Sequence, residues 1–339
     1  MLRVNVEVEY SGFSLSADLT AAQGDFWGLV GSSGSGKSTL LASVGGLVQP
    51  RRGEVALGDR LFFRRREGER RVWMPLSRRR VGYLSQENDL FPHLTVRQNL
   101  AYGVTDDGHL AELVSLLELG DLLDRRPTDL SGGQKSRVAL GRTLAVQPRL
   151  LLLDEPFAAL DWSLRRRLGD LLHRLKERYR CTVLMATHDL EELPRLCSHV
   201  AVLDGGRVLQ AGEVAGVLAA PAGAAAAAAL GYHLLPVEVP AAGWIKIGPQ
   251  TMPYPSAREP GKAVLAFHPA GLRVRSRSGG PADTVITGRV NVAVGFAGTG
   301  WCRLALHGGG EVVLETTPEI ASNGTEVAVG MGEAFLFPD

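Results

Sequence analysis

The sequence has few cysteines and no long apolar run, and both absences exclude classes of protein. Its three cysteines, Cys181, Cys197 and Cys302, are odd in number, far apart and without metal-ligand spacing. We therefore predict free thiols in a reducing compartment rather than a disulfide framework. No stretch approaches the roughly 20 apolar residues that span a bilayer. The first residues, Met1–Val6, alternate like a strand and lack the apolar core of a signal peptide.

The chain is also poor in lysine and has almost no net charge. Arginine supplies nearly all of the basic residues, and the net charge of +1 gives no reason to expect nucleic-acid binding. An arginine-rich insert lies between a short expected strand, Gly58–Phe63, and Met74; no interleaved aromatic platform accompanies it, so we interpret it as a solvated loop. With 339 residues, 45% hydrophobic and 22% charged, the chain fits a globular protein of two domains. The five lysines are Lys37, Lys135, Lys176, Lys246 and Lys262.

One of these lysines lies in a glycine-rich loop between an apolar run, residues 26–30, and an expected helix, residues 38–47. Small residues in such a loop let backbone N–H groups cradle phosphate oxygens at a helix N-terminus. Lys37 is expected to add charge at the β and γ phosphates, and the Ser38 hydroxyl to bind Mg²⁺. The strand and helix context disfavours the alternative, a chance glycine-rich turn. The predicted phosphate-binding residues are Gly31, Ser32, Ser33, Gly34, Ser35, Gly36, Lys37, Ser38 and Thr39.

Two carboxylates follow an aliphatic run, Leu150–Leu153, that is typical of a buried parallel strand. Ligands bind at the carboxyl ends of such strands. We expect Asp154 to hold Mg²⁺ through water and Glu155 to orient and deprotonate an attacking water. Phosphoryl transfer requires mainly positioning and charge neutralisation, so two carboxylates and one metal suffice. The alternative is a surface Asp-Glu pair at the end of a strand.

A pentapeptide precedes this strand by about twenty residues and opens an expected helix, residues 134–146. Its serine can cap that helix, which is the purely structural interpretation. The functional interpretation is a second anion site aimed at a γ-phosphate. The pentapeptide consists of Leu130, Ser131, Gly132, Gly133 and Gln134.

Together, the glycine loop, the pentapeptide and the Leu-Leu-Leu-Leu-Asp-Glu-Pro strand resemble the ATP-binding cassette (ABC) ATPases. The resemblance implies ATP and Mg²⁺ as cofactors, ATP hydrolysis as the reaction, and a pentapeptide that acts in trans. Lys37 and Ser131 of one chain then cannot face the same phosphate. We therefore expect a head-to-tail homodimer with two composite sites.

Four further positions match the motifs of this family. The resemblance implies that Gln86 touches Mg²⁺ and the water, and that Asp161 crosses the dimer interface. It also implies that His188, after a strand, contacts the γ-phosphate and joins Glu155 and Gln86 as a catalytic residue. The metal ligands would then be Ser38, Gln86 and Asp154. Tyr10 lies where the family stacks an aromatic ring on adenine, with Phe13 as its rival.

The segment Asp89–Leu100 resembles bacterial importer ATPases for oxyanions, polyamines, iron and sugars, and residues 58–83 and 113–123 resemble the molybdate importers. The resemblance implies a transmembrane permease and a substrate-binding protein as partners, and a peripheral location on the cytoplasmic face of the plasma membrane. Alternatives are an importer for ferric iron, polyamine or sugar, and a non-transport ABC ATPase. The non-transport enzymes usually carry two cassettes or a long coiled-coil insertion. A binding module without catalysis is disfavoured because the catalytic residue types are intact.

We predict an α/β P-loop NTPase domain of the ABC type in residues 1–218, with a mostly parallel sheet and an antiparallel β subdomain. Within it, residues 96–123 are expected to be helical. Residues 219–234 form an alanine-rich linker, either a short helix or flexible. Residues 235–339 form a small all-β OB-like (TOBE) domain of short strands. This domain lacks the anion-binding segment of molybdate-binding barrels at residues 284–290, which favours a scaffolding role.

Overall fold

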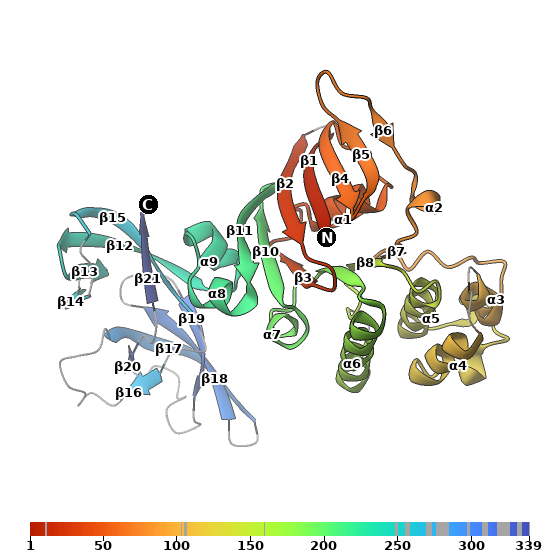
Figure 1. Cartoon of the computed structure of the whole chain (residues 1–339). Coiled ribbons are helices and arrows are strands. Elements are labelled where there is room, and N and C mark those ends of the chain that lie inside the picture. Colours follow the sequence, from red (N-terminus) through yellow and green to blue (C-terminus); the bar gives the residue numbers. More distant parts are fainter. Residues whose placement is uncertain are drawn as a thin grey trace. The chain divides into compact units, whose positions relative to one another are not determined.

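The computed structural model divides the chain into two compact units, Met1–Ala220 and Pro221–Asp339 (Figure 1). The predicted domain bounds at residues 218 and 235 stay predictions. The structure describes residues 1–10, 12–102, 104, 107–158, 160–247, 250–254, 258–268, 273–275, 285–296, 299–306, 311–316, 326–330 and 334–338. Among these residues, no helix combines the length and the apolar character needed to cross a membrane.

The first unit contains one mixed sheet in the order β6-β5-β4-β1-β2-β11-β10-β3-β9-β8-β7. Strands β10, β3, β9, β8 and β7 pair in parallel, and β1, β2, β4, β5 and β6 pair antiparallel. The two halves are joined between β11 and β2 at one pair, Arg207 and Ser16. The strands are β1 Leu2–Tyr10, β2 Phe13–Ala21, β3 Phe26–Val30, β4 Arg52–Leu57, β5 Arg60–Arg65, β6 Val72–Trp73, β7 Gly82–Leu84, β8 Leu150–Asp154, β9 Thr182–Ala186, β10 His199–Asp204 and β11 Arg207–Glu213.

This arrangement confirms the predicted α/β class with a parallel sheet and an antiparallel part. The expected short strand at Gly58–Phe63 corresponds to β5, and the arginine-rich insert after it contains exposed residues 66–71 without strand structure before β6, as a solvated loop requires. Phe62 and Phe63 of β5 are buried in the same core as the α1 residues Leu40 and Leu41. The expected helical segment 96–123 is two separate helices, α3 and α4.

Helices cover the sheet and form two cores with it. The helices are α1 Lys37–Gly45, α2 Leu76–Arg79, α3 Val96–Ala101, α4 Asp107–Leu116, α5 Gly132–Ala145, α6 Trp162–Tyr179, α7 Glu192–Leu196 and α8 Val214–Ala219. Successive residues of a strand point to opposite faces. In β8, Leu151 and Leu153 therefore join the core with α5 and α6, while Leu150 and Leu152 join the core with α1. The two faces of β8 thus hold the phosphate-loop helix on one side and the pentapeptide helix on the other.

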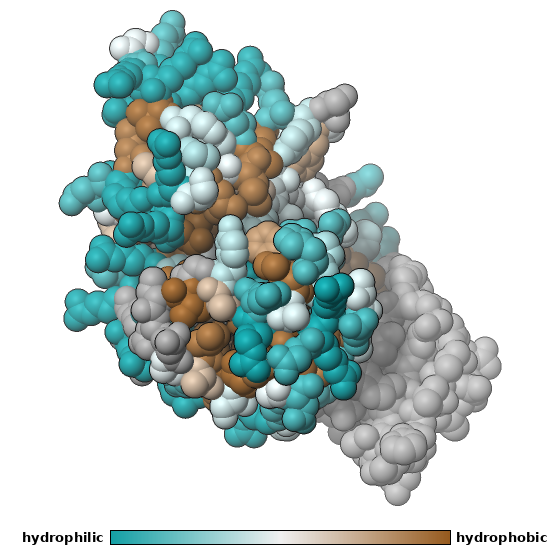
Figure 2. Space-filling view, turned by 90° about the vertical axis from the view of Figure 1, so that its right-hand side faces the viewer, coloured by the Kyte–Doolittle hydropathy of each residue, from teal (hydrophilic) through white to brown (hydrophobic). Residues whose placement is uncertain are grey.

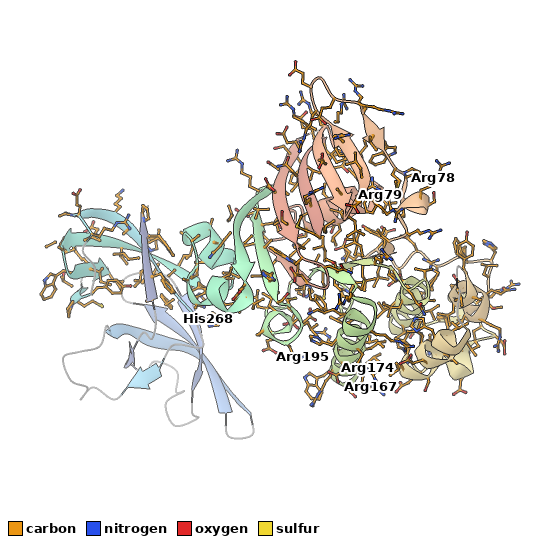
Figure 3. All side chains as sticks on the ribbon, in the orientation of Figure 1. Arg78, Arg79, Arg167, Arg174, Arg195 and His268 are labelled. Atoms are coloured by element: carbon orange, nitrogen blue, oxygen red, sulfur yellow. The ribbon has the colours of Figure 1, made fainter. Side chains whose placement is uncertain are left out.

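Arg79 is a fully buried arginine behind the phosphate-loop helix (Figure 3). Its Nε donates to the Met74 carbonyl at 2.7 Å, and its Nη1 donates to the carbonyls of Ser43 (3.1 Å) and Val44 (2.6 Å) at the end of α1. The rings of Phe62 and Trp73 lie 5.3 and 5.0 Å from the guanidinium. Burial lowers the pKa of Arg79 to about 10. The side chain therefore stabilises the helix C-terminus, where carbonyls lack partners and a positive charge is favoured.

The second unit contains two antiparallel sheets of five strands, in the orders β14-β13-β12-β15-β21 and β16-β20-β17-β18-β19. This confirms the expected small β domain, while an OB-like barrel stays a prediction. The alanine-rich stretch is a helix, α9 Ala224–Ala229, that contacts β12 and β15. The strands are β12 His233–Ala241, β13 Trp244–Ile247, β14 Gln250–Pro253, β15 Gly261–Phe267, β16 Arg273–Arg275, β17 Val285–Phe296, β18 Thr299–Leu306, β19 Glu311–Thr316, β20 Glu326–Gly330 and β21 Ala334–Pro338.

The predictions of free cysteine thiols and of the segment 284–290 can be compared only with the residues that the structure describes. Cys181 and Cys197 are free thiols, as predicted. The side chain of Cys302 lies outside the described part of the chain, as does residue 284.

Candidate functional site

The glycine loop between β3 and α1 adopts a backbone that requires glycine at two positions. Gly31 has φ = 149°, and a Cβ there would lie 2.0 Å from the carbonyl oxygen of Leu203. Gly36 has φ = 105° at the N-terminus of α1, where a Cβ would approach the side chains of Leu15 and Phe13 at 3.0 and 3.1 Å. Both conformations are accessible to glycine and strained for other residues. The loop therefore curves back over the first turn of α1.

Lys37 lies inside this curve and is 8% exposed. Its Nζ donates to the carbonyl of Gly31 at 2.8 Å and to the carbonyl of Ser32 at 3.0 Å. Burial lowers the pKa of Lys37, and the nearby carboxylates of Glu155 and Asp154 oppose that shift. The loop thus places one cation among inward-facing backbone groups at a helix N-terminus, the arrangement that favours a bound anion.

Asp154 ends β8 beside this loop and is 5% exposed. Burial raises the pKa of its carboxyl group, a hydrogen bond with Ser38 opposes the shift, Glu155 adds to it, and Lys37 opposes it. Ser38 and Asp154 are therefore close enough to interact, and the metal site that they would form stays a prediction. Magnesium prefers hard oxygen ligands and retains several waters. The hydroxyl, this carboxylate and the Gln86 amide oxygen fit that preference.

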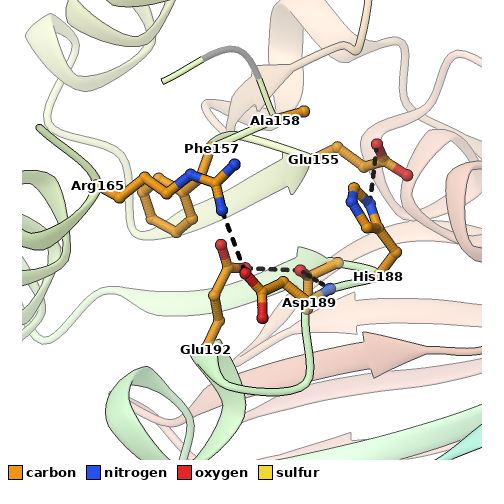
Figure 4. A pocket seen from close by; sticks show the side chains of 8 residues that line it. Glu155, Phe157, Ala158, Arg165, His188, Asp189 and Glu192 are labelled. Atoms are coloured by element: carbon orange, nitrogen blue, oxygen red, sulfur yellow. Dashed lines mark hydrogen bonds and ion pairs between the residues drawn. The ribbon is translucent and has the colours of Figure 1, made fainter. Parts of the chain in front are cut away.

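Glu155 follows β8 with φ = 49°, a left-handed backbone that is uncommon outside glycine. Its amide donates to the carbonyl of Ala186 at 3.1 Å, which ties it to the end of β9. Its carboxylate Oε2 lies 3.4 Å from Nδ1 of His188 (Figure 4). The Glu155 side chain is 23% exposed and that of His188 is 66% exposed. The strained turn therefore brings a partly shielded carboxylate against a solvent-accessible imidazole.

A cleft of about 580 Å³ brings most of the predicted site residues together. Gln86, which follows β7, enters this cleft with Glu155 and His188, although the three are far apart in the sequence. Phe13 lines the cleft, while Tyr10 does not and is 49% exposed. Phe13 is therefore the candidate that lies in the cleft, and the adenine contact itself stays a prediction. The lining residues are Phe13, Gly31, Ser33, Gly34, Gly36, Lys37, Ser38, Thr39, Gln86, Glu155 and His188.

Two predicted phosphate-loop residues, Ser32 and Ser35, do not line the cleft. The Ser32 hydroxyl donates to Asp204 Oδ1 at 3.2 Å. Ser35 is 1% exposed, and its amide donates to the Ser32 carbonyl at 3.1 Å. The Ser35 amide and the Ser32 carbonyl are therefore paired with each other within the loop, and the phosphate contacts of Ser32 and Ser35 stay predictions.

The pentapeptide lies at the exposed N-terminus of α5. Ser131 Oγ accepts a hydrogen bond from the Gln134 amide at 3.3 Å, and Gln134 Oε1 accepts one from the Ser131 amide at 2.9 Å. This reciprocal capping box realises the structural interpretation of the serine. Leu130 is buried in the core, Ser131 and Gly132 are exposed, and none of residues 130–134 is among the described residues that line the cleft.

Asp161 is the N-cap of α6, where its Oδ1 accepts a hydrogen bond from the Leu164 amide at 2.9 Å. Its predicted position at a dimer interface stays a prediction. Asp161 is exposed, so its capping bond leaves it accessible to a second chain.

Sequence reasoning missed a polar network beside His188 (Figure 4). Arg165 Nη1 contacts Asp189 Oδ2 at 3.2 Å, and Thr187 Oγ1 donates to Glu192 Oε2 at 2.6 Å. Burial raises the pKa of Glu192, and its bond with Thr187 opposes that shift. Arg165 lies 24 residues from Asp189 in the chain. The network could have been predicted from the pairing of the parallel strands β8 and β9, because the loops that follow paired parallel strands meet at one edge of the sheet.

The comparisons with known proteins agree with this geometry. Residues 15–158 match the family model described as ABC transporter. The chain is 41% identical over 210 residues to the molybdenum import ATP-binding protein ModC of Pasteurella multocida, covering 61% of this chain and 59% of the relative. It is 40% identical over 227 residues to ModC of Rhizobium meliloti, covering 65% and 62%. The matched part thus spans about six tenths of the length of these relatives.

Solved structures show a similarity over a comparable share of the chain. A dimeric ATP-binding cassette in a post-hydrolysis state, bound to ADP and Pi, has a TM-score of 0.55 and 28% sequence identity. The alignment covers 63% of this chain and 99% of that one.

Proposed function

Because the chain belongs to the ABC transporter ATP-binding proteins, we propose that it is the ATP-hydrolysing subunit of a bacterial importer. The observation that carries this proposal is the cleft that gathers Lys37, Ser38, Gln86, Glu155 and His188 from four segments of the chain. In one small volume it supplies a cation, oxygen ligands, a carboxylate base and an imidazole.

The proposed reaction is hydrolysis of the γ-phosphate of ATP. Backbone N–H groups of the glycine loop and the Lys37 ammonium hold the phosphates, and Phe13 stacks on adenine. When bound, Mg²⁺ neutralises charge on the phosphates, and Ser38, Asp154 and Gln86 are the residues that would hold it. Glu155 orients the attacking water and accepts its proton at a carboxylate oxygen. His188, 3.4 Å from that carboxylate, contacts the γ-phosphate.

The proposed active unit is a homodimer. Ser131 and Gly132 of the pentapeptide are exposed and lie outside the cleft of their own chain, so they are available to a second copy. The similar cassette described above is dimeric. We propose that Ser131 of one copy closes over ATP bound to Lys37 of the other, and that Asp161 lies at the interface between them.

The proposed partners are permease subunits and, through them, a substrate-binding protein, on the cytoplasmic face of the membrane. A groove of about 550 Å³ on α3 and α4 supports the permease contact. Its lining includes Leu100, Leu110, Val114 and Leu123, and the view in Figure 2 shows hydrophobic surface among hydrophilic residues in the first unit. An apolar groove rimmed by polar side chains is suited to an amphipathic helix of a partner.

The proposed cargo is molybdate or a related oxyanion such as tungstate or sulfate. The names of the two relatives, both molybdenum import proteins, support it. Expression of this chain with its own permease and binding protein should restore growth on trace molybdate to a strain that lacks molybdate import. Restored uptake of ferric iron, a polyamine or a sugar instead would reassign the cargo and leave the ATPase proposal intact.

The ATPase proposal is tested by Glu155→Gln, which keeps the shape of the side chain and removes the base. We expect ATP binding to persist, steady-state hydrolysis to fall at least a hundredfold, and an ATP-bound dimer to accumulate in light scattering. Glu191→Gln is the matched control, because Glu191 is an exposed carboxylate in the loop that carries His188. Hydrolysis at the rate of the control would refute the role of Glu155.

A further inference from the structure

Two loops emerge side by side from the neighbouring parallel strands β8 and β9, whose last residues, Asp154 and Ala186, are paired. The first loop leads past Glu155 to Asp161 and into α6. The second carries His188. Because these loops serve the dimer interface and the γ-phosphate in the proposed function, any contact between them links those two sites.

Arg165, on the first turn of α6, makes that contact. Its Nε donates to the carbonyl of Leu160 at 3.0 Å, next to Asp161. Its Nη1 reaches Asp189 Oδ2 at 3.2 Å, next to His188 (Figure 4). One guanidinium therefore holds both loops, which its planar fork of donors allows and a lysine ammonium does not.

The residues on either side of His188 are also held by hydrogen bonds. The Asp189 amide donates to Thr187 Oγ1 at 3.0 Å, and Asp189 Oδ1 accepts from the Glu191 amide at 3.0 Å. Thr187 is anchored to Glu192, as described above. The His188 side chain is itself 66% exposed. Its position is thus set mainly by the backbone between Thr187 and Asp189, and Arg165 is the link from that backbone to the other loop.

We propose that Arg165 is a positioning residue that couples the loop ending in Asp161 to His188. A movement of Asp161 when a second chain docks would pass through Leu160 and the guanidinium to Asp189. His188 would then reach its working position only in the closed dimer. This inference rests on the proposed function, in which Asp161 is an interface residue and His188 contacts the γ-phosphate.

The alternative is an ordinary ion pair. The side chains of Arg165 and Asp189 are both 31% exposed, and such pairs usually contribute little to stability. The two interpretations differ in what they change. A stabilising pair affects the melting temperature, whereas a coupling residue affects turnover while folding and nucleotide binding stay the same.

The test compares Arg165→Gln, Arg165→Lys, Asp189→Asn and the Arg165→Gln/Asp189→Asn double variant in the full chain. We expect each to lower kcat by about tenfold or more, because misplaced catalytic groups are costly. ATP affinity should stay within about twofold, and the double variant should lose no more than either single variant. Arg166→Gln is the matched control, since Arg166 lies on the same helix over the ring of Trp162.

The outcomes separate this inference from the proposed function. Wild-type kcat in Arg165→Gln, or losses that multiply in the double variant, would overturn the coupling while ATP hydrolysis by the wild type would stand. Absence of hydrolysis in both wild type and Arg166→Gln would defeat the proposed function itself. If Arg165→Gln does not fold, the near-isosteric Asp189→Asn gives the result, and its wild-type turnover would overturn the coupling.

Discussion

Ser131→Asp separates the two roles of the pentapeptide serine. Aspartate caps helices as well as serine does, and a carboxylate at a helix N-terminus adds about 0.3–1 kcal/mol of favourable dipole interaction. The second half of the capping box, from the Ser131 amide to Gln134 Oε1, involves no Ser131 side-chain atom. We therefore expect the free energy of unfolding to be unchanged or to rise by about 0.5 kcal/mol.

The proposed function gives the opposite result for activity. A carboxylate about 4 Å from a γ-phosphate is repelled by about 4 kcal/mol per unit charge at an effective dielectric constant of about 20. That energy corresponds to a decrease of about a thousandfold in the equilibrium constant for closure of the dimer. Hydrolysis should therefore collapse, and in the Glu155→Gln background the ATP-bound dimer should vanish from light scattering.

The control for Ser131→Asp is Thr95→Asp, at the other exposed capping box of this kind, where Thr95 and Gln98 cap α3. It should match Ser131→Asp in stability and the wild type in hydrolysis. Ser131→Asp protein that folds normally and hydrolyses ATP would refute the site in trans. Loss of stability in Ser131→Asp would refute the capping argument.

Two further predictions concern a thiol and the adenine contact. Burial raises the pKa of Cys181 from 9.0 to about 12, so the unfolded chain loses this proton at a lower pH than the folded chain. The free energy of unfolding should therefore fall by about 1.4 kcal/mol between pH 8 and pH 10. In denaturant titrations Cys181→Ala should lack that part of the fall, and an equal pH dependence of the unfolding free energy in both proteins would contradict the shift. Phe13→Ala should weaken ATP binding by about tenfold, since a stacked base contributes about 1–3 kcal/mol, whereas Tyr10→Ala should leave it unchanged. Titration with a fluorescent ATP analogue checks both variants, and weaker binding in Tyr10→Ala alone would make Tyr10 the adenine contact.

The residues of the cleft were predictable because local sequence patterns mark them. Lys37 and Ser38 follow from the glycine loop, and Glu155 from the end of an aliphatic strand. The contact of Glu155 with His188 follows once β8 and β9 are neighbours. Phe13 and Tyr10 are only three positions apart, and no local pattern shows which of them lines the cleft; in the structure Phe13 does.

What could not be predicted depends on contacts across the chain. Arg79 lies in an arginine-rich stretch of the sequence, yet its side chain is fully buried. No local pattern marks a buried arginine that binds carbonyls instead of a carboxylate. Similarly, Ser131 looks the same in sequence whether it caps a helix or contacts phosphate, and in this structure the cap is formed.

The burial of Arg79 links two positions that are 33 residues apart. Gly46 ends α1 with φ = 90°, and a Cβ there would lie 2.5 Å from Arg79 Nε and 2.7 Å from its Cζ. Any side chain at position 46 must displace the guanidinium, and a smaller residue at position 79 opens room for one. In a library that randomises both codons, some pairs of residues should therefore be tolerated together although the residue at position 46 is not tolerated beside Arg79.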